Sequence, residues 1–283
     1  MDQPDVSRGG YSIFDETMAD MTYPELEAAA RARAVALWGL GVIEEHGPHL
    51  PLATDVYLPT VMLKLLRRLL AARGVLAVIV PPFYWGVNSV TAGFPGSITV
   101  RPEVMVELMV DVFGSLRRDG FESVFCLSGH GDELHNKTLA EGVRKGRLLT
   151  GVRAYQVLGT LGSQTYRRFG FDLSQPQFLT IPEQPPDVRH LDVHAGAEET
   201  SLLWGYFPGV VRADLLPALE PTNLGLEDLR EWQQGWSNAR RKTPRGYFGD
   251  PAGADPARGR ALIEKHAGLV ADAIVARLGT ARP

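Results

Sequence analysis

Four short, largely apolar runs, separated by stretches with helical periodicity, constrain the fold of this chain more than any other feature of its sequence. The runs cover residues 34–43, 75–80, 122–127 and 152–158. Each is as long as a typical strand, and their continuous apolar character indicates burial on both faces of a sheet. Strands of this kind that alternate with long helices are typical of a mostly parallel sheet between helical layers. The pattern therefore predicts an α/β fold.

Helical patterns fill most of the chain between these runs. A first helix can be capped by Thr22 and is predicted to end near residue 33. Five further helices are predicted over residues 57–70, 101–118, 133–149, 195–204 and 257–278. Residues 159–190 and 217–258 are predicted to be loops. No internal repeat or linker is evident, so a single domain is expected over residues 1–283.

Composition and charge exclude several classes of protein. A formal net charge of −4 provides no basic face, which argues against nucleic-acid binding. The N-terminal segment lacks the basic and apolar regions of a secretory signal, and no apolar stretch reaches the roughly 20 residues of a membrane helix. The single cysteine, Cys126, excludes an internal disulfide framework and is predicted to lie in the core. A soluble cytoplasmic protein is therefore expected.

Six of the seven histidines lie in three short segments, each of which also contains carboxylates. The segments hold, in order, His46 and His49, then His130 and His135, then His190 and His194. Each falls at a predicted junction between a strand, a loop and a helix. Imidazole nitrogens together with carboxylate oxygens suit Zn²⁺, Mn²⁺ and related ions. Three such junctions favour one shared metal site over three coincidences.

The first segment, residues 44–55, follows a predicted buried strand. In an extended chain Glu44 and His46 point to the same side, because side chains alternate. Asp55 falls at the predicted N-cap of the next helix, so one loop can supply both oxygen and nitrogen ligands to a metal. The alternative is that Asp55 only caps the helix and that His49 only forms a hydrogen bond. This segment alone does not choose between the two.

The second segment places His130 between Gly129 and Gly131, which allow the backbone to approach a metal or substrate closely. It lies at the carboxyl end of a predicted strand, where open α/β sheets bind their ligands. Asp132 is a further candidate ligand, although a cap of the following helix is the alternative. His135, on that helix, is expected to lie behind the ligands or at the surface.

The third segment, residues 190–201, introduces another predicted helix. One of its carboxylates could bind a metal, and His194 could move protons. The alternative is a helix N-terminus at which acidic residues are favoured by the helix dipole.

Residues 44–55 resemble the signature of the creatininase family, commonly E-Q-H-G-P-H-L-P-L-x-T-D. Shorter matches follow in the family's order: M-T-W-x-E at 21–25, F-P-G-T-[IL] at 94–98, N-G-H-G-G-N around 129–131, H-A-G-x-x-E-T-S from 194, and G-D-P at 249–251. Because the first motif is long and specific, the chain is identified as a member of this family.

The resemblance implies a three-layer α/β/α sandwich with a mostly parallel central sheet, a homo-oligomer that is often a hexamer, and two divalent metal ions, Zn and/or Mn. Matching motif positions gives four metal ligands: Glu44, His46, Asp55 and His130, with Asp55 as the bridge. Either Asp132 or Glu199 would complete the second metal site, and the resemblance leaves both open. His194 matches a histidine that contacts substrate and moves protons, so it is the leading catalytic candidate beside Glu199 and Asp132.

The activity implied by the resemblance is that of a metal-dependent hydrolase acting on a small cyclic amide or related C–N bond, with a metal-activated water at a dinuclear site. The substrate would be a small polar molecule, with no nucleic-acid or membrane partner. Two alternatives stay open. One is ring-opening hydrolysis of a cyclic ketone of the inosose type, with C–C cleavage; the other is a metal-binding protein without catalysis.

Several positions depart from the family pattern near the predicted mouth of the site. Glu45 replaces a glutamine, Ser128 an asparagine, Asp132 a glycine and Asn88 a serine. These departures leave the metal centre intact and leave the substrate open. Five aromatic residues could line the pocket, with burial in the core as the alternative for each: Tyr84, Trp85, Trp204, Trp232 and Trp236.

Overall fold

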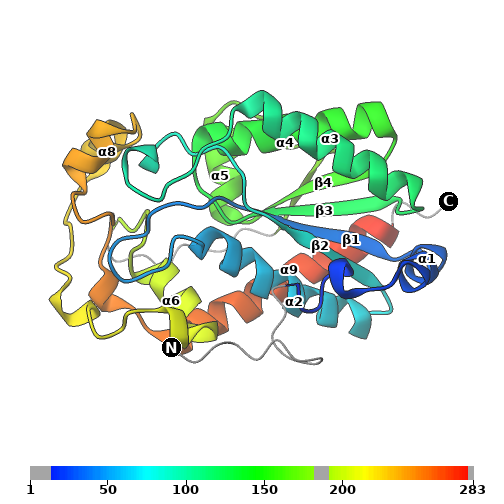
Figure 1. The fold of residues 1–283 in the computed structure, drawn as a ribbon, viewed down its shortest axis with the longest axis horizontal. Helices are drawn as coiled ribbons and strands as arrows, with labels where there is room; N and C mark the ends of the chain where they lie inside the picture. Colours follow the sequence, from blue (N-terminus) through cyan, green and yellow to red (C-terminus); the bar gives the residue numbers. More distant parts are fainter. Residues whose placement is uncertain (1–13, 182–190, 280–283) are drawn as a thin grey trace.

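The computed structural model describes residues 14–181 and 191–279, which fold around a five-stranded sheet (Figure 1). The strands are β1 (Val35–Leu40), β2 (Ala77–Phe83), β3 (Ser123–Ser128), β4 (Arg153–Leu158) and β5 (Phe178–Thr180). Their order across the sheet is β2-β1-β3-β4-β5, and every neighbouring pair is parallel. The four predicted strands are confirmed, and a fifth adds to the edge beside β4.

The helices of the described residues are α1 (Tyr23–Arg31), α2 (Thr54–Ala72), α3 (Pro102–Arg118), α4 (Glu133–Thr150), α5 (Thr160–Arg168), α6 (Ala197–Tyr206), α7 (Leu226–Trp232), α8 (Ser237–Lys242) and α9 (Pro256–Gly279). Short 3₁₀ turns occur at Met18–Asp20, Thr91–Gly93, Pro208–Val210, Leu216–Ala218 and Pro251–Gly253. The six predicted helices are confirmed. The prediction of loops over residues 159–190 and 217–258 is wrong for α5, β5, α7 and α8.

Helix α2 begins earlier than the sequence pattern predicts. Ala53 is its N-cap residue, and Asp55 lies inside the first turn. The prediction that Asp55 caps this helix is therefore wrong. The carboxylate of Asp55 is free of a capping role, which leaves both of its oxygens available to other groups.

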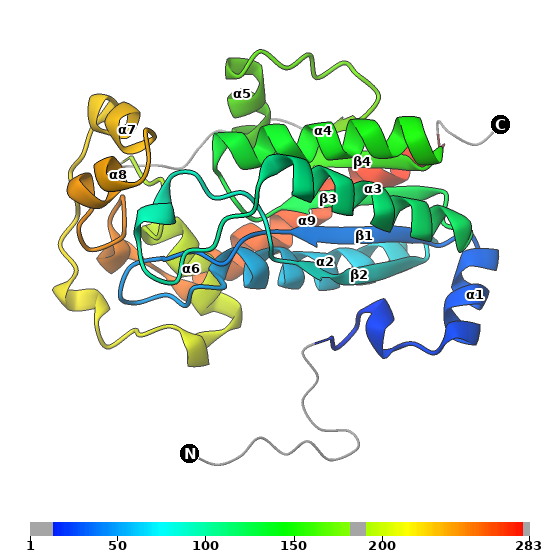
Figure 2. The ribbon, with the colours of Figure 1, turned by 45° about the horizontal axis from the view of Figure 1, so that its top comes forward.

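Helices cover both faces of the sheet, with α3 and α4 on one side and α2 and α9 on the other (Figures 1 and 2). Successive residues of β1 enter the two cores. Trp38 packs in the core that contains Phe113 and Cys126, whereas Leu37 packs in the core that contains Leu66. Burial of every β1 residue explains why the strand reads as a continuous apolar run. The predicted three-layer α/β/α sandwich and the buried position of Cys126 are confirmed.

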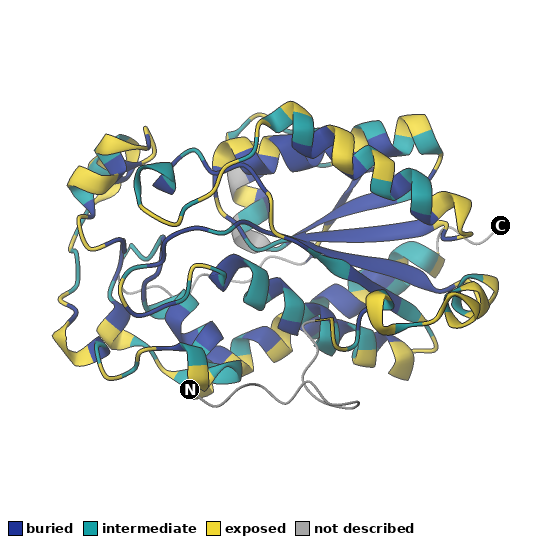
Figure 3. Ribbon diagram, in the orientation of Figure 1, coloured by how far each residue is buried: buried dark blue, intermediate teal, exposed yellow. Residues whose placement is uncertain are grey.

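The central strands β1 and β3 are buried along almost their whole length, while many exposed residues lie on the outer helix faces (Figure 3). At the carboxyl end of β1 the sheet has β2 on one side and β3 on the other. Such a point, where the strand order reverses, opens a crevice in α/β sheets. The loops after β1, β2 and β3 extend there, toward α6, α7 and α8 (Figure 2). None of the described helices is both long and apolar enough to cross a membrane.

Candidate metal centre

The three histidine-rich segments converge at the carboxyl ends of β1 and β3. Glu44 and His46 lie in the loop after β1, Asp55 in the first turn of α2, and His130 in the loop after β3. Glu199 reaches the same place from the first turn of α6. The first four side chains are almost completely buried, so residues from four separate elements share one enclosed polar centre.

Two glycines explain how the first turn of α2 reaches this centre. A Cβ atom on Gly41, just after β1, would lie 2.2 Å from the Asp55 carbonyl oxygen, and a Cβ on Gly129, just after β3, would lie at the same distance. Only residues without a side chain allow this approach. By contrast, a Cβ on Gly131 would meet no atom within 4 Å. Of the two glycines beside His130, only Gly129 therefore makes the close approach.

Asp55 stands between two histidines. Its Oδ1 lies 3.3 Å from His46 Nε2, and its Oδ2 lies 3.0 Å from His130 Nδ1. Glu44 Oε1 is 3.0 Å from His130 Nδ1, and Glu199 Oε2 is 3.8 Å from His46 Nε2. The side chains thus form three groups with ligand atoms within 4.8 Å of one another. Two of them have Asp55 in common, Glu44–Asp55–His130 and His46–Asp55–Glu199, and the third is Glu44–His46–His194.

The chemistry of these groups fits divalent metal ions. His46 Nε2 and Asp55 Oδ2 are buried and have no hydrogen-bond partner among the described residues. Nor does any described lysine or arginine form an ion pair with the three carboxylates of these groups. Buried carboxylates without a cation are costly. A mixed set of imidazole and carboxylate donors suits zinc or manganese.

The pKa values of the buried groups also favour cation binding at this centre. Burial is the largest effect on His46 and opposes its charge, but the Asp55 and Glu199 carboxylates together outweigh it and raise the pKa of His46. Burial likewise opposes ionisation of Asp55, yet His46 and His130 hold the pKa of that carboxyl well below its usual range. Carboxylates that draw protons onto neighbouring imidazoles also attract cations, and metal binding displaces those protons.

Asn88 and Thr91, in the loop after β2, fix the orientation of Glu44. Glu44 Oε2 accepts hydrogen bonds from Asn88 Nδ2, at 3.0 Å, and from the Thr91 hydroxyl. Asn88 Nδ2 also lies 2.8 Å from Thr91 Oγ1. Both residues are buried. The second carboxylate oxygen of Glu44 is thereby left to face His130, which is the kind of support that metal ligands need.

The sequence did not reveal this support. Asn88 stood out only as a departure from the family pattern, and Thr91 had no assigned role. The parallel sheet alone could have indicated this support. The strand β2 runs parallel to β1, so the loops that follow the two strands lie at the same edge of the sheet.

The two carboxylates that the sequence left open have different surroundings. Asp132 is the N-cap residue of α4, and its Oδ1 accepts hydrogen bonds from the backbone N–H groups of Leu134 and His135. Its Oδ2 accepts from Ser89 N, Ser89 Oγ and Val90 N. Asp132 belongs to none of the candidate metal groups found among the described residues, whereas Glu199 belongs to one.

The helix after the second segment holds its polar residues more deeply than expected. His135 was expected behind the ligands or at the surface, and it is fully buried. Its Nδ1 accepts a hydrogen bond from Val87 N at 3.3 Å, and its ring packs against His130 at 5.1 Å between centroids. Asn136 Nδ2 donates to the His130 carbonyl oxygen at 2.9 Å. Both residues thus support the loop that carries His130.

His194 lies at the edge of the same centre. Its backbone pairs with Phe248 in an antiparallel bridge. Its Nε2 is 2.8 Å from the Glu45 carbonyl oxygen, its Nδ1 is 3.8 Å from Glu44 Oε1, and its ring is 4.4 Å from the His46 ring. The histidine that precedes it in the third segment, His190, lies outside the described residues.

Glu45, the residue that departs from the family's glutamine, contacts His194. Its Oε1 is buried, has no hydrogen-bond partner among the described residues, and lies 3.4 Å from His194 Nε2. Burial alone would lower the pKa of His194, but the neighbouring carboxylates, Glu44 first and then Glu45 and Glu199, raise it to about 10.

The aromatic candidates separate into buried and exposed residues. Trp232 is buried, and its ring lies 5.8 Å from the His194 ring. Tyr84, Trp85 and Trp236 are exposed, and Trp204 packs at the edge of the core under α6. Trp232 is thus the aromatic residue that adjoins the centre.

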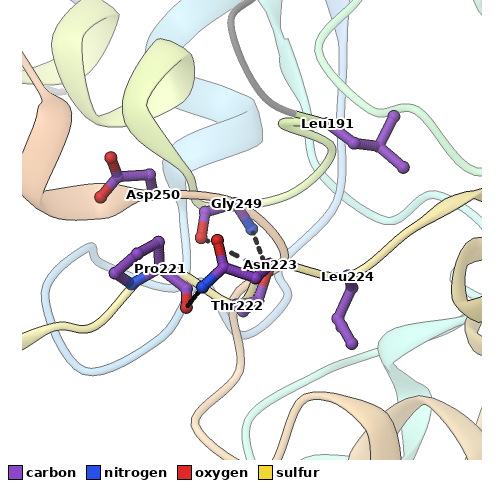
Figure 4. A pocket seen from close by; sticks show the side chains of 7 residues that line it. All are labelled: Leu191, Pro221, Thr222, Asn223, Leu224, Gly249 and Asp250. Atoms are coloured by element: carbon purple, nitrogen blue, oxygen red, sulfur yellow. Dashed lines mark hydrogen bonds between the residues drawn. The ribbon is translucent and has the colours of Figure 1, made fainter.

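A cavity of about 180 Å³ lies beside Gly249, near the candidate centre in sequence but with its own lining (Figure 4). Its lining residues are Leu191, Pro221, Thr222, Asn223, Leu224, Gly249 and Asp250. Gly249 directly follows Phe248, and its N–H donates to Thr222 Oγ1 at 3.1 Å. None of the candidate metal ligands lines this cavity, so it is separate from the polar centre.

Comparison with known proteins agrees with this picture. The profile of the family described as "Creatininase: Creatinine amidohydrolase" matches residues 19–274. A mycofactocin precursor peptide peptidase of Mycobacterium ulcerans (strain Agy99) is 26% identical over 228 residues, 79% of this chain and 78% of the relative. A creatinine amidohydrolase of Pseudomonas putida is 25% identical over 204 residues, 70% of this chain and 74% of the relative.

Solved structures share the fold. A structure titled "Creatininase Mn" has a TM-score of 0.67 at 20% identity and covers 92% of this chain and 97% of its own. A mutant creatininase described as "Zn-Zn type" also has a TM-score of 0.67, at 21% identity, and covers 93% of this chain and 97% of its own. With the family profile matching most of its length, the chain belongs to the creatininase family and is a metal-dependent hydrolase.

Proposed function

We propose that this enzyme hydrolyses a small cyclic amide or a related C–N bond at a dinuclear centre in which Asp55 bridges two divalent ions, zinc and/or manganese. One observation carries the proposal. The two carboxylate oxygens of Asp55 face two different histidines, each of which has its own second carboxylate. A bridging carboxylate between two sets of N and O donors is the arrangement that a metal pair requires.

Each ion has its own ligands in this proposal. Glu44 and His130 would hold the first ion and His46 and Glu199 the second, with Asp55 common to both. When bound, the two ions would activate a water molecule as the nucleophile and polarise the bond under attack. Four of these five side chains are almost completely buried, and Glu199 is the one that is partly exposed.

His194 is the candidate proton carrier. An Nε2–H that donates to the Glu45 carbonyl oxygen, at 2.8 Å, fixes the ring and leaves Nδ1 facing the centre. Acidic neighbours favour its protonated form. A protonated imidazole at this point can give its proton to the leaving nitrogen when the C–N bond breaks.

The name of the peptidase relative favours a second substrate, a peptide bond. The reaction class is the same, because a peptide bond is also an amide C–N bond. The departures at Glu45 and Asn88 do not lie at an open mouth of the site, because both residues are buried beside His194 and Glu44, so they act on the groups of the centre.

A substrate panel tests this proposal. Protein reconstituted with Zn²⁺ or Mn²⁺ is assayed with creatinine, other cyclic amides, formamides, short peptides and cyclic ketones, beside a His194→Gln variant. We expect turnover of a C–N substrate and a loss of about 10²-fold or more in the variant, with metal content unchanged. Cleavage confined to cyclic ketones would move the assignment to C–C hydrolysis. A metal-loaded protein inert toward the whole panel would contradict the proposal.

A further inference from the structure

His49 is a buried histidine of the first segment that belongs to none of the candidate metal groups found among the described residues. Its Nε2 forms a hydrogen bond of 2.9 Å with Thr200 Oγ1, across 151 residues of sequence. The edge of its ring packs against Tyr247, with 6.1 Å between centroids. The contact therefore joins the loop after β1 to the first turn of α6.

Thr200 directly follows Glu199, the α6 carboxylate of the metal centre. The Thr200 side chain is completely buried, and in the described part of the chain His49 is the one partner recorded for its hydroxyl. Its backbone N–H donates to the Gly196 carbonyl oxygen at 3.1 Å. Any shift of the Thr200 side chain would accordingly move the turn that presents Glu199.

The turn that carries Glu199 contains a strained backbone position and depends on its surroundings. Ala195 has a φ of 48°, a left-handed conformation that costs about 1–2 kcal/mol for a residue with a side chain. In this conformation the Ala195 N–H donates to Glu199 Oε2 at 2.6 Å. Gly196, the N-cap residue of α6, has no side chain, and the cap comes from Asp192, whose Oδ2 accepts from Glu198 N at 2.9 Å. Strained backbone persists at functional sites only where the surroundings determine it.

We propose that His49 is a positioning residue, which through Thr200 holds the first turn of α6 so that Glu199 can bind the second metal ion. This inference rests on the proposed dinuclear centre. His49 acts on the ligand geometry and does not touch the ion or the substrate. Residues that orient metal ligands typically contribute about 10-fold to 100-fold to metal affinity.

The proposed ligand Glu44 of the first ion is held by other residues than Glu199 of the second. The affinities of the two ions can therefore be changed separately. Glu44 is held by Asn88 and Thr91 from the loop after β2, and neither residue contacts α6 by hydrogen bonds recorded in the described chain. Loss of the Thr200 hydroxyl should therefore weaken only the ion at His46, Asp55 and Glu199. Loss of the Thr91 hydroxyl should weaken only the ion at Glu44, Asp55 and His130.

Zinc titration of the demetallated full chain, followed by calorimetry, tests this inference. Glu44→Gln and Glu199→Gln first assign the two binding events of the wild-type protein, because each removes a ligand of one ion. Thr200→Val, which has nearly the same shape without the hydroxyl, should weaken the event lost in Glu199→Gln by about 10-fold to 100-fold. Thr200→Ser keeps a hydroxyl and should restore the affinity. Thr91→Val is the matched control and should weaken the other event.

A second pair of variants covers a folding failure of Thr200→Val. His49→Phe should produce the same selective loss, and the His49→Phe/Thr200→Val double variant should lose no more than either single one, because both remove one interaction. Equal weakening of both events, or wild-type affinity in Thr200→Val and His49→Phe, would overturn the positioning role. Fewer than two ions on the wild-type chain would instead overturn the dinuclear centre and this inference with it.

Discussion

At the scale of single residues, the buried histidines form two electrostatic classes. His46, His130 and His194 lie among carboxylates, which raise their pKa values despite burial. For His49 and His135 burial is the largest effect, and neighbouring histidines add to it, so their pKa values fall to about 4 and about 3. The first class can exchange protons for cations, whereas the second stays neutral and serves as hydrogen-bonding structure.

The neutral state of His135 predicts a dependence of stability on pH. The folded-state pKa of about 3 lies below the ordinary value of 6.5, so below pH 6.5 the unfolded chain binds a proton that the folded chain does not. His135 should therefore lower the free energy of unfolding by about 1.4 kcal/mol for each pH unit as the pH falls from 6.5 toward 3.

Denaturant unfolding of the metal-free protein at several pH values measures this slope. His135→Gln, which does not titrate, is the comparison, and its slope should be smaller by the contribution of one proton. Equal slopes for the two proteins would show that His135 is not held neutral in the fold.

Local sequence predicts which candidate ligands lie close together, but not which groups hold them in place. Glu44, His46 and Asp55 fall in one specific motif, and the structure gathers them as expected. The contact between His49 and Thr200 spans 151 residues, so no local pattern contains it. Likewise, the choice between Asp132 and Glu199 depends on donors from the loop after β2, which engage Asp132.

At the scale of elements, the metal centre depends on how closely α2 approaches the ends of two strands. The carbonyl oxygen of Asp55 lies 2.2 Å from the positions that Cβ atoms on Gly41 and Gly129 would occupy. This contact sets the depth of the first helical turn, and with it the position of the Asp55 carboxylate between His46 and His130.

A pair of glycine substitutions tests this packing. Gly129→Ala forces a methyl group against the Asp55 backbone, so it should destabilise the fold by about 1–3 kcal/mol and reduce metal content. Gly131→Ala is the control, because a Cβ there meets nothing within 4 Å. Thermal unfolding and elemental analysis of both variants measure the effects. Loss of metal in both variants, or in neither, would contradict the proposed contact.

The elements that sequence patterns predicted are those whose burial is regular. β1 and β3 are buried on both faces, and their continuous apolar runs indicate this burial in the sequence. α5 is held differently, because Tyr166 is its deeply buried aromatic residue, and the Tyr166 hydroxyl donates to the Asn136 carbonyl oxygen at 2.7 Å. Contacts between residues far apart in the sequence produce no periodic hydrophobic pattern. A range rich in polar residues therefore predicts a loop where the structure has a helix.

At the scale of the whole molecule, the proposed metal ligands come from parts of the chain that are far apart in sequence. Glu44 and His130 leave different strands, and Glu199 comes from α6, which packs on α9 at the sheet's outer layer. An ion held by such ligands binds the folded chain and not the unfolded one, so it stabilises the fold by mass action.

Metal removal should therefore lower the thermal stability. At a free metal concentration 100 times the Kd, one ion contributes about 2.7 kcal/mol, which corresponds to a change in Tm of about 5 °C or more for a chain of this size. Thermal unfolding with and without a chelator measures this change. An unchanged Tm would contradict the view that metal ions hold the converging segments together.

The most direct test of the shared role of Asp55 is the metal content of the purified protein, measured by elemental analysis beside an Asp55→Ala variant. Because the two oxygens of Asp55 face both ligand groups, we predict about two transition-metal ions per wild-type chain and the loss of both in the variant. A variant that keeps an ion at full occupancy would contradict the bridging role. A wild-type chain that takes up no metal, even after reconstitution with Zn²⁺ or Mn²⁺, would contradict the metal centre itself.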